Sequence, residues 1–114
     1  MTEMKFAVSI AALALAGAAG PCIADGSADS ATLARGKALF QTQAVPACAV
    51  CHTLADAGAE GAIGPNLDDL KPELEQVRRA LIDGVGVMPS FADSLSEDDL
   101  NAVAEYVVSA SKGG

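Results

Sequence analysis

Large side chains are scarce in this sequence of 114 residues, which contains no Trp, one Tyr and three Phe. Beyond residue 24 the aromatic side chains are Phe40, Phe91 and Tyr106. A small domain with so few bulky side chains is difficult to fill with protein atoms alone. The composition therefore predicts that another component contributes apolar volume to the core.

Basic residues are also few, since 7 Lys and Arg accompany 15 Asp and Glu and the formal net charge is −8. Nucleic acids and anionic membrane surfaces attract basic proteins, so this balance argues against both as partners. Net charge of this kind says little about the fold.

A long hydrophobic run is found only near the start, where residues 6–19 are apolar or small apart from Ser9. This run of about 14 residues is shorter than the roughly 20 that a membrane-spanning helix needs. Lys5 precedes the run, and Cys22-Ile23-Ala24 offers small residues at the two positions that a signal peptidase reads, which is typical of a secretory signal peptide. We therefore expect a signal peptide at 1–24.

Cleavage after Ala24 leaves one domain at 25–114, exported to the periplasm and not inserted in a membrane. The length suits a single small domain with one core. Cys22 also permits a lipoprotein interpretation, but Pro21 stands before it where lipid attachment prefers a small residue.

Strand-like alternation is absent, and three helical patterns are separated by loops rich in Gly and Pro. The expected helices run from Ser30 to about Gln41, from Lys71-Pro72 to Gly84, and from Ser96 to about Ala110. Their apolar faces contain Leu33, Gly36 and Phe40; Leu74, Val77 and Leu81; and Leu100, Val103, Ala104 and Val107. The sequence predicts an all-α domain with long loops packed around another component.

Single residues mark the ends of these helices and a contact between them. Ser96 followed by Asp99 resembles a capping box, and Pro72 suits a first helical position. Gly36 lowers helix stability by about 1 kcal/mol relative to Ala. Its presence therefore predicts that another helix crosses closely at this point.

The residues with the most distinctive binding chemistry lie together in Cys48-Ala49-Val50-Cys51-His52, a C-x-x-C-H sequence. This pattern is typical of c-type haem attachment, in which both thiols form thioethers and His52 ligates the iron. A thioredoxin-like dithiol needs a βαβ context that is absent here. A zinc site needs four ligands, and the region after residue 24 offers too few soft ones. A structural disulfide between the two cysteines stays open, but it leaves the adjacent His unexplained.

Few residues of the chain could serve as the second ligand of the haem iron. His52 is the sole His, and Met88 is the sole Met beyond the expected signal peptide. Met88 lies in a loop between Gly86 and Pro89, which favours a ligand over the gap-filling core Met that is the usual alternative. We expect Met88 to be the sixth iron ligand.

Three motifs in this order resemble the class I c-type cytochromes of bacteria. They are the C-x-x-C-H sequence, Gly64-Pro65-Asn66-Leu67 and Val87-Met88-Pro89, and the resemblance extends over nearly all of 25–114. It implies a small class I cytochrome c fold, with three main helices and long loops wrapped around one covalently bound haem c.

The resemblance also implies roles for single residues. The carbonyl of Pro65 is expected to accept a hydrogen bond from His52, and Gly36 and Phe40 are expected to meet Tyr106 at a helix crossing. The expected walls of the haem site are Leu67, Leu81, Val87 and Phe91. The roles of Asn66, Arg78 and Arg79 stay open between haem contacts and ordinary turn or surface positions.

A periplasmic one-electron carrier, not an enzyme, is the function implied by one His/Met-ligated haem. More narrowly, residues 51–58 and 84–89 resemble small cytochromes that accept electrons from periplasmic sulfite dehydrogenases. The expected acceptor is a terminal oxidase or another cytochrome. Two alternatives are a haem subunit locked in a dehydrogenase complex and a haem sensor or peroxidase-like protein with a displaceable Met88.

Overall fold

A computed structural model describes residues 28–112, so the expected signal peptide lies outside the described part of the chain. Helix α1 (Ser30–Ala38) leads into a π-helical turn, Leu39–Gln43. Helices α2 (Leu67–Leu70), α3 (Leu74–Asp83) and α4 (Glu97–Ser111) follow. Short 3₁₀ turns lie at Cys48–Val50 and Ala55–Ala57. The mostly helical fold expected from the sequence is confirmed.

A minimal hairpin accompanies these helices. Strands β1 (Thr53–Leu54) and β2 (Ala59–Glu60) pair antiparallel, with Thr53 opposite Glu60. Gly58 turns the chain between them at a φ of 64°. Strands of two residues carry no alternation, which explains why no strand was expected.

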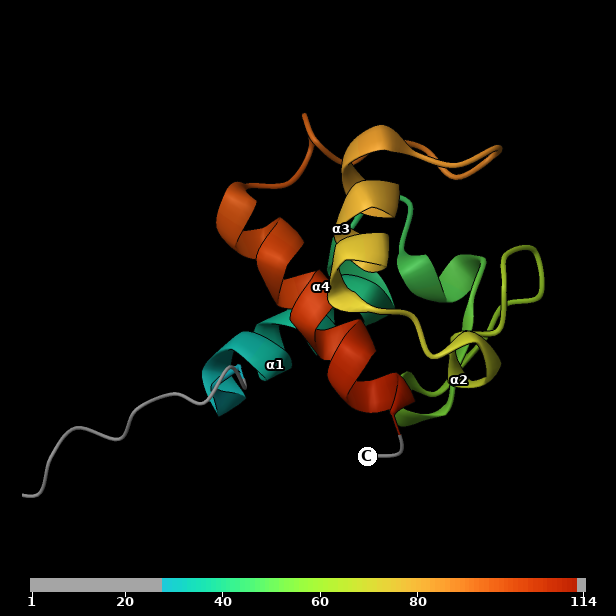
Figure 1. Cartoon of the computed structure of the whole chain (residues 1–114), viewed down its shortest axis with the longest axis horizontal. Helices are drawn as coiled ribbons and strands as arrows, with labels where there is room; N and C mark the ends of the chain where they lie inside the picture. The colour runs from blue at the N-terminus through green and yellow to red at the C-terminus, as the bar shows by residue number, and fades with distance from the viewer. Residues whose placement is uncertain (1–27, 113–114) are drawn as a thin grey trace, which may run out of the picture.

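Helix α4 forms the centre of the core and contacts both α1 and α3. Figure 1 shows these three helices gathered together, while the loop after α3 and the segment between α1 and α2 extend away from them. The expected face of α4 is buried, and Ala102 and Tyr106 are buried beside it. No helix within residues 28–112 has the length and apolar character needed to cross a membrane.

The crossing of α1 and α4 confirms the expectation for Gly36. A Cβ added there would lie 2.1 Å from the Ala102 carbonyl oxygen and 2.6 Å from the Tyr106 Cβ. Phe40 and Tyr106 pack edge to face with ring centroids 6.0 Å apart, a favourable arrangement for aromatic rings. Only a residue without a side chain permits this approach.

Helix boundaries differ from the expectation at the N-terminal ends. Asp29, not Ser30, caps α1, because its carboxylate accepts a hydrogen bond from the Thr32 N–H at 2.7 Å. Helix α3 begins at Leu74, not at Pro72, since Lys71 ends α2 in the left-handed conformation with a φ of 47°. The residue before a proline is disfavoured in the helical region, so the chain must leave one helix before it starts the next.

The other ends are closer to the expectation. Ser96 caps α4, where its hydroxyl accepts a hydrogen bond from the Asp99 N–H at 3.1 Å. Gly84 ends α3 with a φ of 74°. Helix α4 continues one residue past Ala110, to Ser111.

Candidate functional site

The C-x-x-C-H segment forms a tight turn at the edge of the core. The N–H groups of Cys51 and His52 both donate to the Cys48 carbonyl, at 3.1 and 2.9 Å. This turn brings both thiols and the imidazole into one short segment. Cys48 and Cys51 are half-buried and are not joined by a disulfide.

The environment of Cys48 argues against a redox-active dithiol. Burial raises the pKa of its thiol to about 11. A nucleophilic cysteine needs the opposite shift, because the thiolate is the reactive form. Within residues 28–112 no group of three or more His, Cys, Asp or Glu side chains has an arrangement that could hold a metal ion.

His52 is oriented through its Nδ1 atom, which lies 2.8 Å from the carbonyl oxygen of Pro65. A carbonyl can only accept, so Nδ1–H is the donor and the lone pair stays on Nε2. This contact is the one that the family resemblance implies. It fixes the tautomer and ring orientation that a metal-ligating histidine requires.

Two glycines between β2 and α2 let the backbone approach the C-x-x-C-H turn. A Cβ on Gly64 would lie 2.6 Å from His52 Cε1, and one on Gly61 would lie 2.6 Å from His52 N. The Gly64 N–H donates to the Cys51 carbonyl at 2.7 Å, and the Thr53 hydroxyl donates to the Gly61 carbonyl at 2.9 Å. The imidazole is thus clamped between its own turn and this returning segment.

Asn66 has a structural role that the sequence left open. Its side chain accepts hydrogen bonds from the N–H groups of Asp68 and Asp69 and caps α2. Asp68 in turn accepts a hydrogen bond from the Ala55 N–H at 2.8 Å, which ties α2 to the segment after His52. The capping interaction, and not contact with the cavity, explains Asn66.

Met88 is presented by a tight turn after α3. Val85 and Met88 exchange both backbone hydrogen bonds, at 3.0 and 2.8 Å. Gly86 has a φ of 55° at the first central position, as a type II′ turn requires. The Phe91 N–H donates to the Leu81 carbonyl at 2.7 Å and anchors the far end of the loop to α3. Met88 is therefore held by backbone contacts on both sides.

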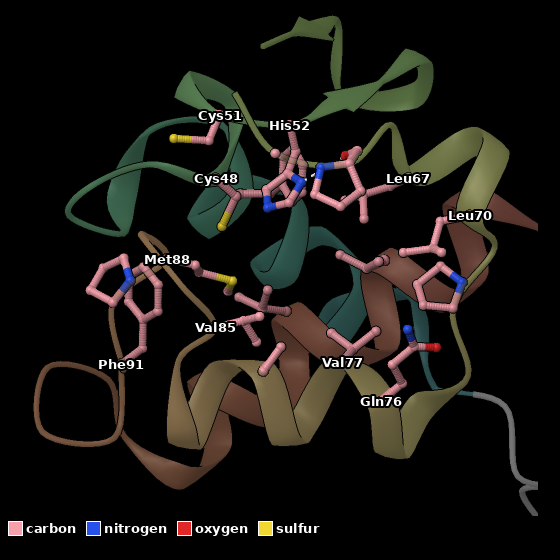
Figure 2. A pocket seen from close by; sticks show the side chains of 18 of the residues that line it. Cys48, Cys51, His52, Leu67, Leu70, Gln76, Val77, Val85, Met88 and Phe91 are labelled. Atoms are coloured by element: carbon pink, nitrogen blue, oxygen red, sulfur yellow. Dashed lines mark hydrogen bonds between the residues drawn. The ribbon is translucent and has the colours of Figure 1, made fainter. Parts of the chain in front are cut away.

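One cavity of about 660 Å³ joins these parts. Figure 2 shows His52 and Cys48 extending into it from the C-x-x-C-H turn and Met88 from the loop after α3. All seven residues singled out as cofactor contacts line it: Cys48, Cys51, His52, Pro65, Leu67, Met88 and Phe91. Val87 lines it too, whereas Leu81 does not and is instead buried in the core at 2% exposure.

The cavity fits a covalently bound haem. Its volume lies in the range of about 300–1,000 Å³ that is usual for ligand and cofactor sites. Apolar side chains form most of the lining, and two thiols and the lone pair of His52 Nε2 are available to it. Aromatic side chains are too few to fill this space, which agrees with the sparse composition.

Sequence reasoning missed the roles of Gly61, Gly64 and Asp68. Each acts on a backbone group or a ring that is 8 to 13 residues away in the chain. The short spacing of Gly58, Gly61 and Gly64 was the available signal. It indicates a segment that can pack closely, but not what it packs against.

Comparisons with known proteins agree with this site. A family model described as cytochrome c oxidase, cbb3-type, subunit III matches residues 31–107. Cytochrome c6 of Cladophora glomerata is 37% identical over 86 residues, covering 69% of this chain and 89% of that protein. Chloroplastic cytochrome c6 of Chlamydomonas reinhardtii is 35% identical over 91 residues, covering 71% of this chain but only 56% of that protein.

A solved structure is similar as well. The c-type cytochrome SorU from Sinorhizobium meliloti shares 44% sequence identity with a TM-score of 0.70. The match covers 73% of this chain and 94% of that one. Sequence and fold therefore point to the same class of protein.

Proposed function

We propose that this chain, which is a class I c-type cytochrome with one covalent haem c, is a periplasmic one-electron carrier. It belongs to the family described as cytochrome c oxidase, cbb3-type, subunit III, whose model matches residues 31–107. Cys48 and Cys51 would hold the haem through thioethers, and His52 Nε2 and the Met88 sulfur would ligate its iron. When bound, the haem supplies an iron that alternates between the ferrous and ferric states.

The observation that carries this proposal is the orientation of His52. Its Nδ1–H is used by Pro65, so the Nε2 lone pair is free for the cavity that Met88 also lines. Met together with His raises the potential of haem iron. Two protein ligands also leave no iron position for a substrate, which favours a carrier over an enzyme.

Electron transfer is fastest when little rearranges, and the chain's own contacts suit this requirement. The His52 segment is tied to its neighbour by the Gly64–Cys51 backbone bond at 2.7 Å. The Met88 loop is tied to α3 by the Phe91–Leu81 bond at 2.7 Å. Both ligands thus sit on backbone that is fixed independently of the iron's charge.

The axial ligands can be tested by spectroscopy. The oxidised protein should show the weak near-infrared charge-transfer band of sulfur-ligated iron, and Met88→Ala should abolish it. The variant should also bind cyanide much faster and have a lower potential. Ile82→Ala is the matched control, because Ile82 is an exposed apolar residue of α3 that does not line the cavity. A band that survives Met88→Ala would show that Met88 only packs.

Two other functions of the same haem site predict different behaviour. A sensor or peroxidase-like protein requires Met88 to leave readily, so the unaltered protein would bind cyanide rapidly. A subunit locked in a dehydrogenase complex would not purify alone from the periplasm. The hydrogen-bonded Val85–Met88 turn favours a Met88 that stays in place.

The electron donor we propose is a periplasmic sulfite dehydrogenase, and the acceptor is a terminal oxidase or another cytochrome. Support comes from residues 51–58 and 84–89, which resemble cytochromes that serve such dehydrogenases. Sulfite-dependent reduction by a purified sulfite dehydrogenase tests the donor. N-terminal sequencing of the periplasmic protein tests export, and the expected first residue is Asp25.

A further inference from the structure

Charged side chains are rare in the cavity lining. Among the described residues, Glu75 and Arg79 are the acidic and basic side chains that line it, and both belong to α3. Gln76 lies between them and lines the cavity as well. Apart from the C-x-x-C-H turn, the polar side chains of this largely apolar cavity are therefore concentrated on one helix.

Two adjacent arginines on α3 have different surroundings. Arg78 donates to Asn101 at 2.9 Å, and its Nε lies 3.9 Å from Glu75. It does not line the cavity. Arg79 lines the cavity, and within residues 28–112 it makes no hydrogen bond or ion pair. Glu75, four residues before Arg79, is within ion-pair distance of Arg78 and not of Arg79.

The position of this helix matters because haem has two different edges. The vinyl groups that become thioethers lie on one side of the macrocycle, and two propionates lie on another. Figure 2 shows the cysteines at one end of the cavity and Gln76 at the opposite end. Arg79 is three residues after Gln76 on α3, so both lie on nearly the same helix face.

We propose that Arg79 binds a haem propionate, whereas Arg78 does not. This inference rests on a haem being bound in the cavity and deepens the proposed function at the same site. A guanidinium matches a carboxylate in geometry and charge, and such pairs are stronger than neutral hydrogen bonds. An uncompensated carboxylate at this place would face Glu75 in a chain of net charge −8.

The test compares Arg79→Gln with Arg78→Gln, which removes the same charge one residue away. Covalent haem content is measured first, by the pyridine haemochrome spectrum, so that only loaded protein is compared. The resonance Raman band of propionate bending should shift in Arg79→Gln and stay unchanged in Arg78→Gln. The midpoint potential should fall further in Arg79→Gln, because losing a close cation favours the ferric state.

Arg79→Lys keeps the charge but loses the bidentate geometry, so its propionate band should shift while most of the potential is retained, and it serves as the test variant if Arg79→Gln does not load haem. Equal band positions and equal potentials in the Arg78 and Arg79 variants would overturn the proposal. Failure of the proposed function would appear elsewhere. Loss of His/Met ligation removes the near-infrared band and leaves the propionate band readable.

Discussion

The two sides of this molecule are built in different ways. Where α1 meets α4, Gly36 permits the close approach and side chains complete the contact: Phe40 packs on Tyr106, and Arg35 pairs with Asp99. Around the haem cavity, glycines and backbone hydrogen bonds make the contacts. The helix crossing is complete in the protein itself, whereas the cavity side depends on a cofactor to fill it.

The two sides also differ in their content of charged residues. Three segments that contribute to the cavity lining, residues 44–52, 61–67 and 84–91, contain no Asp, Glu, Lys or Arg. Several apolar side chains on them are largely exposed, among them Val85, Val87 and Ile63. The net charge of −8 therefore comes from other parts of the chain.

The largest expected effect comes from leaving the cavity side unfilled. At about 24 cal/mol per Å³, a closed cavity of about 660 Å³ would cost about 16 kcal/mol, as an upper limit for a cavity that has a mouth. Whole domains are stable by only about 5–15 kcal/mol. Replacing both Cys48 and Cys51 by Ala should therefore yield little folded protein, as judged by NMR dispersion. Cys48→Ala alone keeps one thioether and should give an intermediate yield.

The helix crossing can be broken without touching the haem. Gly36→Ala places a methyl group 2.1 Å from the Ala102 carbonyl oxygen, which is backbone and cannot rotate away. We expect a loss of about 3 kcal/mol in unfolding free energy, measured by denaturant titration, although Ala is the better helix former. Gly58→Ala is the control, because its added Cβ meets nothing within 4 Å. It should cost only about 1 kcal/mol, from its φ of 64°. Equal losses would mean that the crossing is not tight.

A smaller effect on stability is expected from the hydrogen bond that joins the helix crossing to the segment after His52. The Tyr106 hydroxyl donates to Asp56 at 2.6 Å, and this bond holds the pKa of Asp56 below its ordinary value. Partial burial opposes the shift, and Lys37 adds to it. A lowered carboxyl pKa contributes stability above about pH 4, which is lost as the pH falls through the folded-state pKa.

Tyr106→Phe should lower the free energy of unfolding by about 1 kcal/mol at neutral pH. It should also make the loss of stability below about pH 4 shallower, because Asp56 then titrates nearer its unfolded value. Denaturant titrations at several pH values measure both. Lys37→Ala, which removes the weaker contact at 3.5 Å, should change the acid limb less. An unchanged acid limb in Tyr106→Phe would contradict this account.

The same contrast explains what the sequence could and could not predict. C-x-x-C-H and Gly36 were informative because close sequence spacing or one helix face determines their roles. Helix α2 and the Gly64–His52 contact depend on segments that meet only in the folded chain. Pro72 suited a helix start, but Lys71 in the left-handed region overrides that local preference. Arg78 and Arg79 are adjacent and chemically identical, so only the fold separates them.

The smallest expected effect concerns the charge sensed at the cavity mouth. If electrons leave through the three uncharged segments, a small anionic oxidant such as ferricyanide should sense less negative charge than a net −8 implies. The oxidation rate should then rise only weakly with added salt.

Two charge variants test whether the cavity mouth is the exit. Val87→Asp introduces a charge at an 88%-exposed residue that lines the cavity, whereas Ile82→Asp introduces one at a residue that does not. Two unit charges about 6 Å apart in water interact by about 0.7 kcal/mol, or about threefold in rate per unit charge of the oxidant. At about 0.1 M salt the screening length is near 10 Å, so the effect should be largest below that concentration. Stopped-flow measurements should show stronger slowing for Val87→Asp than for Ile82→Asp, and the difference should fade with salt. Equal slowing would mean that the oxidant responds to the net charge of the molecule and that the uncharged mouth has no part in electron exit.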